Sequence, residues 1–347
     1  MINDHEYMQR CLYLAQLGAG WVAPNPMVGA VLVYDQNIIG EGYHQKFGEA
    51  HAEVNCINSV KKNDKQFISK STMFVSLEPC AHFGKTPPCT DLIIESNIPR
   101  VVIGCRDPFK KVNGKGIQKL QDADVQVIVN VLEKECIEIN KRFFLFNTQH
   151  RPYIILKWAM TADRKMAGTD GNRLYITGEI TNRVVHKWRS EEAAILVGTN
   201  TTILDNPELT TRLWQGRSPV RLVIDMNLEV PVSHKIFNRE AETVIFNARK
   251  HEEGNPFYYQ VTNDVSLVQQ VIHALYQMKI QSVLVEGGAR LLQSFLDEGM
   301  WDEARVITNN QLRIREGLKA PNLMHEQKIE EENYFSDVIE YFRNVKC

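Results

Sequence analysis

The stretch HAEVNCINSV, residues 51–60, places a histidine and a glutamate at the start of a segment with the apolar spacing of an amphipathic helix. Downstream, residues 76–93 read SLEPCAHFGKTPPCTDLI, in which Cys80 and Cys89 each follow a proline. Proline suits the first turn of a helix, and the partial positive charge at a helix N-terminus favours a thiolate over a thiol. The two segments therefore predict a site built from one imidazole and two thiolates.

Such a donor set is typical of catalytic zinc. Three protein ligands, His51, Cys80 and Cys89, leave the fourth coordination position open. Zinc lowers the pKa of a bound water to about 7. Glu53 lies about 200° around a helix from His51, so it need not be a metal ligand. It can instead take a proton from the metal-bound water and give it to a leaving nitrogen of the substrate. A closed structural site with His82 as fourth ligand is the alternative, and it gives Glu53 no role.

The elements around this site predict an α/β domain. The strand-like runs 28–34 and 38–43 flank Asp35-Gln36-Asn37, which is a hairpin signal. Further strands are expected at 72–77, 100–105 and 125–129, and helices near 51–62, 89–97, 115–122 and 131–146. Single helices between strands indicate a largely parallel sheet that is covered on both faces.

A polar stretch, FNTQHRP at 146–152, ends in proline and marks the expected domain boundary. A chain of 347 residues exceeds one ordinary core, so we divide it into residues 1–147 and 148–347. The second part is again α/β. Its expected strands are 153–160, 193–198, 220–226, 242–247, 282–286 and 303–308, its helices are 179–190, 264–278 and 288–297, and 253–260 and 309–322 are expected loops.

The composition narrows the class of protein. Forty Lys and Arg against 42 Asp and Glu give a formal charge of −2, without the basic excess of a nucleic-acid binder. No apolar run reaches about 18 residues, and the N-terminus lacks the apolar core of a signal peptide. Seven cysteines, an odd number, favour reduced thiols over a disulfide framework. We expect a cytoplasmic enzyme with no membrane or nucleic-acid partner.

Several motifs of the first part carry a family resemblance. HAE, PNPMVGAVLV (24–33), EPCAHFGKTPPC (78–89) and DPFKKVNGKG (107–116) resemble the deaminase half of the bifunctional riboflavin-biosynthesis deaminase/reductases. Eight residues separate the two cysteines here, whereas the general nucleobase deaminase signature has two. The resemblance implies a cytidine-deaminase-like three-layer α/β/α fold. It also implies a phosphoribosylated 2,5-diaminopyrimidinone substrate that loses one ring amine as ammonia.

The same resemblance implies substrate contacts from Asn25, His44, Lys85 and Asp107. Lys85 suits a phosphate because its ammonium is a compact charge. The alternative is that Asn25 and Asp107 are turn residues beside prolines and that Lys85 is a solvated loop lysine. Phe109 stands where the family often has asparagine.

The second part contains a strand that runs into GGARLLQSFLDEG, residues 287–299. Two glycines at a strand-to-helix junction allow close backbone approach, and a helix N-terminus attracts phosphate. With LKWAMTADRKMAG (156–168), VVHKWRSEEAAILVG (184–198) and ILVGTNTTILDNPELTTR (195–212), it resembles the reductase half of the same family. That half has a dihydrofolate-reductase-like α/β fold and uses NADPH to reduce a ribosylamino chain to a ribitylamino chain.

Carried over by position, the resemblance implies two groups of residues. The cofactor contacts would be Ala159, Tyr175, Thr201, Asp205, Gly287 and Gly288. The substrate contacts would be Lys157, Arg173, Arg189, Leu209, Arg212 and Glu286. The alternatives are that Arg189 is a helix C-terminal charge, Asp205 a turn residue and Glu286 a surface residue. Arg173-Leu174-Tyr175 stands where the family has Ser-x-Trp, and Asp163-Arg164 where it has Asp-Gly.

We therefore expect a homo-oligomeric enzyme that binds Zn²⁺ and NADPH and acts on a small phosphoribosyl-pyrimidine. In one alternative only the deaminase is active, and the second domain is a binding or assembly module. In another, the enzyme deaminates a base in a nucleic acid. The neutral charge and the second domain oppose that, and no basic stripe with aromatic stacking residues is recognisable.

Overall fold

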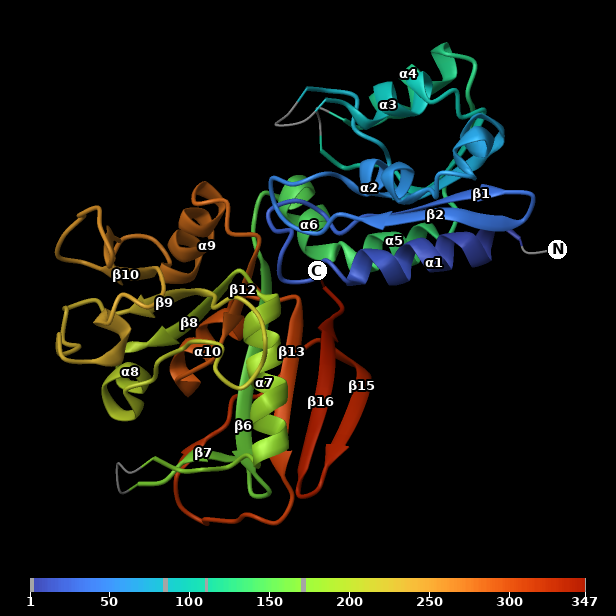
Figure 1. The fold of residues 1–347 in the computed structure, drawn as a ribbon. Helices are drawn as coiled ribbons and strands as arrows, with labels where there is room; N and C mark the ends of the chain where they lie inside the picture. The colour runs from blue at the N-terminus through green and yellow to red at the C-terminus, as the bar shows by residue number, and fades with distance from the viewer. Residues whose placement is uncertain (1–2, 84–86, 110–111, 170–172, 347) are drawn as a thin grey trace. The chain divides into compact units, whose positions relative to one another are not determined.

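Figure 1 shows a computed structural model of the chain, which describes residues 3–83, 87–109, 112–169 and 173–346. The chain forms two compact units, Met1–His150 and Arg151–Cys347. Each has its own sheet and its own buried clusters. In the described part of the chain, no helix is both long and apolar enough to cross a membrane.

The first unit is built on a five-stranded sheet in the order β2-β1-β3-β4-β5. The strands are β1 Gly29–Tyr34, β2 Asn37–Tyr43, β3 Thr72–Leu77, β4 Arg100–Cys105 and β5 Gln126–Ile128. The predicted hairpin is confirmed: Asp35 and Gln36 have φ of 47° and 62°, the left-handed pair that a two-residue hairpin loop requires. β1 is antiparallel to both neighbours, and β3, β4 and β5 are parallel.

Helices cover both faces of this sheet. On one face α1 (Asp4–Gln16) and α5 (Glu133–Ile139) bury apolar side chains such as Met8, Leu12 and Cys136. On the other face α2 (Ala52–Ser59), α3 (Cys89–Glu95) and α4 (Lys115–Asp122) bury Cys56, Ile93 and Leu120. A short 3₁₀ helix, η1 (Lys65–Lys70), precedes β3. The expected three-layer α/β/α arrangement is confirmed, and it places α2 and α3 on the same face.

The single helix expected over 131–146 is wrong, because the structure has two helices that meet at Asn140. These are α5 and α6 (Lys141–Gln149). The buried side chain of Asn140 accepts a hydrogen bond from the Met27 N–H and donates one to the Met27 carbonyl, both at 2.8 Å. The apolar periodicity continues through Asn140, so the sequence predicts one helix. The break depends on Met27, which is 113 residues away in the chain.

The second unit contains a nine-stranded sheet in the order β11-β10-β9-β8-β12-β6-β13-β16-β15. Its strands are β6 Tyr153–Thr161, β8 Ala194–Gly198, β9 Val220–Ile224, β10 Thr243–Asn247, β11 Phe257–Gln260, β12 Ser282–Val285, β13 Glu303–Asn309, β15 Glu326–Tyr334 and β16 Asp337–Asn344. From β11 to β13 all neighbours are parallel, and β16 and β15 add an antiparallel edge. β7 (Lys165–Ala167) and β14 (Leu318–Lys319) pair separately.

The helices of this unit are α7 (Glu179–Glu191), α8 (Thr199–Asp205), α9 (Leu267–Gln277) and α10 (Ala289–Asp297), with a 3₁₀ helix η2 at Lys235–Phe237. β11 corrects the loop expected at 253–260, because Phe257–Gln260 pairs in parallel with β10. β14 likewise lies inside the loop expected at 309–322. Since the strands from β11 to β13 are parallel, their C-terminal ends lie at one edge of the sheet, where β8 leads into α8 and β12 into α10.

Candidate active sites

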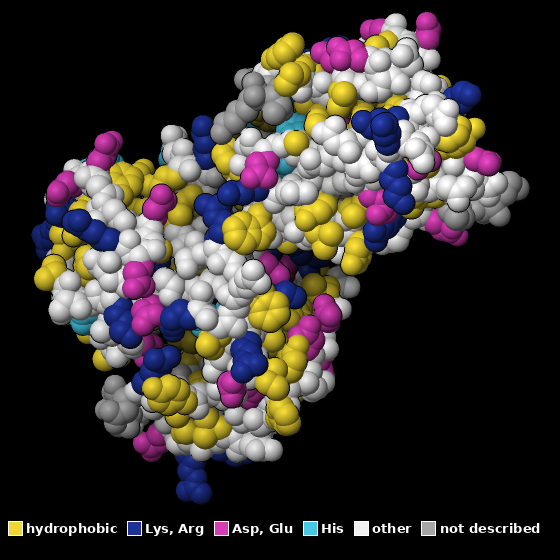
Figure 2. Space-filling view, in the orientation of Figure 1, with side chains coloured by type: hydrophobic (Ala, Val, Ile, Leu, Met, Phe, Trp, Pro, Cys, Tyr) yellow, Lys and Arg dark blue, Asp and Glu magenta, His cyan; other side chains and the backbone are white. Residues whose placement is uncertain are grey.

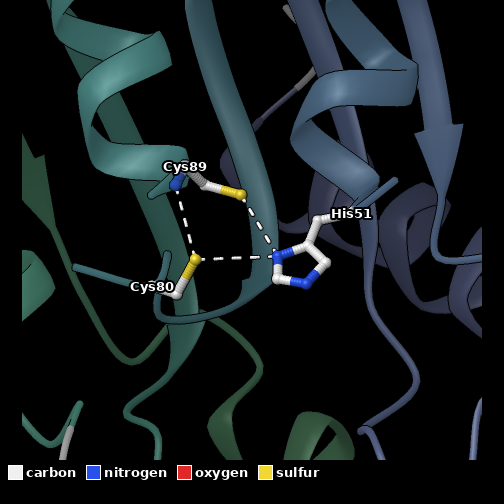
Figure 3. A group of neighbouring side chains, drawn as sticks. All are labelled: His51, Cys80 and Cys89. Carbon is white, nitrogen blue, oxygen red and sulfur yellow. Dashed lines mark hydrogen bonds between the residues drawn. The ribbon is translucent and has the colours of Figure 1, made fainter. Parts of the chain in front are cut away.

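The predicted metal ligands meet in the first unit. His51 is the N-cap residue of α2, Cys80 follows β3, and Cys89 is the first residue of α3. Figure 3 shows both sulfur atoms next to the same ring nitrogen: Cys89 Sγ lies 3.3 Å and Cys80 Sγ 3.6 Å from His51 Nδ1. All three ligand atoms lie within 4.8 Å of one another. One nitrogen and two sulfur donors at this spacing fit zinc with an open fourth position.

The described residues give no support to a closed site with His82. The cluster in which every ligand atom is within 4.8 Å of the others contains His51, Cys80 and Cys89, and His82 is outside it. The centre of the His82 ring lies 6.4 Å from that of the Phe109 ring. The six described cysteines, Cys11, Cys56, Cys80, Cys89, Cys105 and Cys136, are free thiols.

The hydrogen bonds and charges around Cys80 favour its thiolate form, which suits a cation. The backbone N–H of Cys89, at the start of α3, donates to Cys80 Sγ at 3.4 Å. A hydrogen bond from the Cys89 side chain, helped by His51, lowers the pKa of the Cys80 thiol to about 4 and raises that of Cys89. Cys80 therefore carries negative charge at neutral pH, as a metal ligand must.

Glu53 lies in the first turn of α2, two residues after the metal ligand His51. Its side chain is buried in the interior of the unit. Burial, together with Cys80, raises the pKa of its carboxyl group, and His51 opposes that rise. A carboxyl group with a raised pKa beside a metal site is suited to accept a proton and return it.

Asn25 and His44 lie next to the cluster. Asn25 Nδ2 lies 3.1 Å from His44 Nε2, and His44 Nδ1 lies 3.0 Å from the Ala50 carbonyl. The carbonyl must accept, so Nδ1 carries the proton and Nε2 accepts from the amide. The His44 ring meets the His51 ring edge-on at 5.4 Å. Burial lowers the pKa of His44, which keeps the ring neutral.

Asp107 follows β4 and is buried, and burial raises the pKa of its carboxyl group to about 7. Its Oδ1 accepts the Phe109 N–H at 2.8 Å, so a turn role is present as well. Lys85 lies outside the described residues. Glu78, which sequence reasoning missed, binds the backbone of the segment after Asp107.

In the second unit, Lys157, Arg189 and Glu286 form a largely buried cluster, with 14%, 13% and 8% of their side chains exposed. Arg189 Nε and Nη2 donate to the two carboxylate oxygens of Glu286 at 2.9 and 2.8 Å. Lys157 Nζ is 3.6 Å from Glu286 Oε2. Burial alone would raise the pKa of Glu286, but Arg189 and Lys157 together lower it to about 2. The surface reading of Glu286 is wrong, because only 8% of its side chain is exposed.

His186 is a neighbour of this cluster that sequence reasoning missed. It lies on α7, one turn before Arg189, and is buried. Its Nδ1 accepts the backbone N–H of Arg212 at 2.9 Å and that of Leu213 at 3.4 Å. The Arg212 guanidinium pairs with Glu208. The feature that identifies His186 is its buried ring nitrogen, which accepts backbone N–H groups. This feature is visible only in the tertiary structure.

Two of the expected cofactor positions, Thr201 on α8 and the glycine pair before α10, lie against each other. A Cβ placed on Gly287 would lie 3.3 Å from the Thr201 side chain, and one on Gly288 would lie 3.6 Å from Thr201 Oγ1. Gly288 has φ of 49°, a backbone conformation that glycine tolerates best. This glycine cradle beside a helix N-terminus fits the phosphates of a dinucleotide such as NADPH.

The remaining predicted positions are more dispersed. The Arg173 guanidinium lies 5.0 Å from the centre of the exposed Tyr175 ring. Its charge opposes the rise in pKa that burial causes at Asp205, the last residue of α8. Leu209 is buried in an apolar cluster, so only its backbone can contact a ligand. Ala159 pairs with Ile307 across β6 and β13.

These features define the class of protein: an enzyme with a zinc-dependent deaminase domain followed by a second α/β domain, in which a glycine pair at a helix start would suit a dinucleotide. Residues 1–105 match the zinc-binding region of cytidine and deoxycytidylate deaminases, and residues 152–310 match the RibD C-terminal domain. The riboflavin biosynthesis protein RibD of Aquifex aeolicus is 39% identical over 98% of each chain. This chain belongs to the RibD family.

Solved structures agree with that assignment. A diaminohydroxyphosphoribosylaminopyrimidine deaminase/5-amino-6-(5-phosphoribosylamino)uracil reductase from Thermotoga maritima superposes with a TM-score of 0.89 at 36% identity, over 98% of each chain. RibD from Acinetobacter baumannii gives a TM-score of 0.90 at 29% identity and the same coverage. The predicted fold class, a cytidine-deaminase-like domain followed by a dihydrofolate-reductase-like domain, is confirmed.

Proposed function

We propose that this chain catalyses two successive steps of riboflavin biosynthesis. It first deaminates 2,5-diamino-6-(5-phosphoribosylamino)pyrimidin-4-one and then reduces the ribosylamino chain of the product with NADPH. The observation that carries the first step is the meeting of His51 Nδ1 with two cysteine sulfur atoms. The match to the RibD C-terminal domain supports the second step and disfavours a silent second domain.

In the deaminase, His51, Cys80 and Cys89 would hold zinc, which would supply a nucleophilic water at neutral pH. Oxygen adds to the ring carbon that bears the amine, ammonia leaves, and the carbon keeps the oxygen as a carbonyl. The Glu53 carboxylate accepts one water proton and delivers it to the leaving nitrogen, and the other water proton ends on the adjacent ring nitrogen as the carbonyl forms. Asn25 and His44 orient the ring, while Lys85 and Asp107 contact the ring or the phosphoribosyl group.

In the reductase, NADPH supplies a hydride, and the protein supplies orientation and electrostatics. The ribose opens to an imine-like chain, C1 accepts the hydride, and the adjacent nitrogen gains a proton. Thr201, Gly287 and Gly288 would hold the cofactor phosphates, with Ala159, Tyr175 and Asp205 as further cofactor contacts. The substrate side would be formed by Lys157, Arg173, Arg189, Leu209, Arg212 and Glu286.

We assign the deaminase to residues 1–147 and the reductase to residues 148–347. We also propose that the protein is cytoplasmic and forms homo-oligomers. Basic and acidic side chains are interspersed over the face in Figure 2, which suits a small substrate better than a nucleic-acid strand. Native mass spectrometry at micromolar concentration tests the oligomer, and a monomer there contradicts it.

The test of the proposed function is an assay in two stages with the diaminopyrimidinone nucleotide. Ammonia release is measured first without NADPH, and NADPH oxidation is followed after the cofactor is added. Glu53→Gln should lower ammonia release by about 10²- to 10⁴-fold, because it removes a proton carrier, while zinc content stays unchanged. Zinc-loaded wild type that releases no ammonia would overturn the deaminase. Ammonia release without NADPH oxidation would overturn the reductase.

A further inference from the structure

Glu78 is a buried carboxylate that binds four backbone N–H groups of one segment. It follows β3 and is 3% exposed. Its Oε2 accepts the N–H groups of Asp107 at 3.3 Å and Gly114 at 3.0 Å. Its Oε1 accepts those of Gly116 at 2.9 Å and Ile117 at 3.3 Å. Both oxygens are therefore occupied by the stretch that leads from β4 into α4.

This carboxylate replaces a local cap for α4. The N-cap residue of that helix, Gly114, has no side chain to accept the first N–H groups, and no side-chain cap is present. Gly116 and Ile117 lie in the first turn, and their N–H groups donate to Glu78, which lies just after β3. A negative charge at a helix N-terminus also interacts favourably with the helix dipole. The start of α4 thus depends on a residue about 36 positions earlier in the chain.

Two glycines, Gly114 and Gly116, allow the start of α4 to approach Glu78 closely. A Cβ on Gly116 would lie 2.1 Å from the Pro79 carbonyl oxygen and 3.2 Å from Glu78 Oε1, so any larger residue would push the segment away. Gly114 has φ of 80°, which favours glycine. On the strand side, the Glu78 N–H donates to the Cys105 carbonyl at 2.9 Å and joins the ends of β3 and β4.

Glu78 stands between two parts of the deaminase site. Two residues after it comes Cys80, whose sulfur faces His51. On its other side, the bonded segment begins at Asp107 and carries Phe109, whose N–H binds the Asp107 carboxylate. One carboxylate therefore connects the backbone that bears a metal ligand to the backbone that bears a proposed substrate contact.

We infer that Glu78 is a positioning residue of the deaminase, which holds the backbone of Asp107 and of Gly114, Gly116 and Ile117 in place beside the metal cluster. The inference rests on the proposed deaminase function. Glu78 does not touch the reacting atoms, because both its oxygens are engaged by backbone donors. Its loss should therefore weaken substrate binding more than it slows the chemistry.

The test compares Glu78→Gln with wild type. The amide keeps the size of the side chain but turns one acceptor into a donor that faces backbone donors. We expect the KM for ammonia release to rise at least about tenfold, which is about 1.4 kcal/mol. We expect kcat to fall by less than KM rises, and zinc stoichiometry to stay the same. Hydrogen exchange should quicken selectively at the amides of Gly114, Gly116 and Ile117.

Glu41→Gln is the matched control. Glu41 belongs to the same unit and pairs with Arg10 at 2.6 and 2.9 Å, away from the 107–117 segment, so its variant reports a lost ion pair alone. Glu78→Asp keeps the charge on a shorter side chain and should restore part of the lost affinity. Zinc content and a thermal unfolding curve followed by circular dichroism show whether the first unit of each variant is still folded. If Glu78→Gln does not fold, Glu78→Asp carries the same comparison.

A second readout measures binding without turnover, by titrating the diaminopyrimidinone nucleotide into Glu53→Gln and into Glu53→Gln/Glu78→Gln. The double variant should bind at least about tenfold more weakly. Equal affinities, or a Glu78→Gln protein in which kcat alone falls, would overturn the positioning role and leave the deaminase intact. A zinc-loaded wild type with no ammonia release would instead overturn the proposed function, and the positioning role with it.

Discussion

At the scale of single residues, the stability of the second unit depends on charged side chains that are largely buried and form ion pairs with one another. Glu286 is held ionised by Arg189 and Lys157, with its pKa lowered to about 2. Burial lowers the pKa of Lys157, and its proximity to Glu286 opposes that effect. Removing one partner of such a cluster leaves an uncompensated charge, which typically costs about 3–5 kcal/mol. The cluster therefore contributes to the stability of the second unit.

His186 gives this region a pH dependence. Burial, then Arg189 and Arg212, lowers its pKa to about 4, below the ordinary 6.5. The neutral ring accepts two backbone N–H groups. A lowered histidine pKa means that the unfolded chain binds the proton first, so this stabilisation is complete above about pH 6.5 and is lost as the pH falls toward 4.

We predict that His186→Asn flattens the pH dependence of the free energy of unfolding between pH 6.5 and 4, because asparagine can accept an N–H without titrating. Urea denaturation at several pH values measures this. His273→Asn is the control, since His273 is exposed on α9. Identical slopes for wild type and His186→Asn would contradict the prediction.

At the scale of elements, the cofactor edge depends on how closely α8 approaches the turn before α10. A Cβ on Gly287 would press on the Thr201 side chain at 3.3 Å. We predict that Gly287→Ala weakens NADPH binding about tenfold, or about 1.4 kcal/mol, and leaves ammonia release unchanged. Fluorescence titration of NADPH measures the affinity.

Gly178→Ala is the matched control for this prediction. A Cβ there would meet Asp337 at 3.6 Å, which is an ordinary contact at the start of α7. Equal NADPH affinities for Gly287→Ala and Gly178→Ala would remove the glycine pair from the cofactor site.

The helices and strands also show where prediction from apolar periodicity succeeds and where it fails. Apolar periodicity located most strands and helices to within a few residues, because each buries one face. It joined α5 to α6, because a polar Asn140 can occupy a helical position. It missed β11, where Asn255 and Pro256 precede the strand, because the pairing partner that makes Phe257–Gln260 extended is β10.

At the scale of the whole molecule, two compact units carry separate chemistry. The predicted metal ligands lie in the first unit, and the glycine pair that we propose to bind the cofactor lies in the second. We predict that removing zinc with a chelator abolishes ammonia release but preserves NADPH oxidation when the deaminated nucleotide is supplied. Parallel loss of both activities would contradict the separation.

Re-addition of zinc is the control for that experiment, and it should restore ammonia release. Cys80→Ser should reproduce the chelated state, because an alcohol is a poorer zinc ligand than a thiolate. Metal analysis of each sample by mass spectrometry shows whether the activity follows the zinc content.

The sequence by itself determined the chemistry of the metal centre and the two-domain α/β plan. Metal ligands are few in kind, and their residue types, with prolines and helix starts beside them, are readable along the chain. The motifs around 78–89 and 287–299 also indicate the family without any knowledge of the tertiary structure.

Only the tertiary structure decided which polar groups form hydrogen bonds or ion pairs with one another. Glu78 meets a segment that begins 29 residues later, His186 meets a backbone 26 residues later, and Arg189 meets Glu286 across 97 residues. Buried polar groups must find partners wherever packing brings donors and acceptors together. That requirement acts in space, so no local pattern records it.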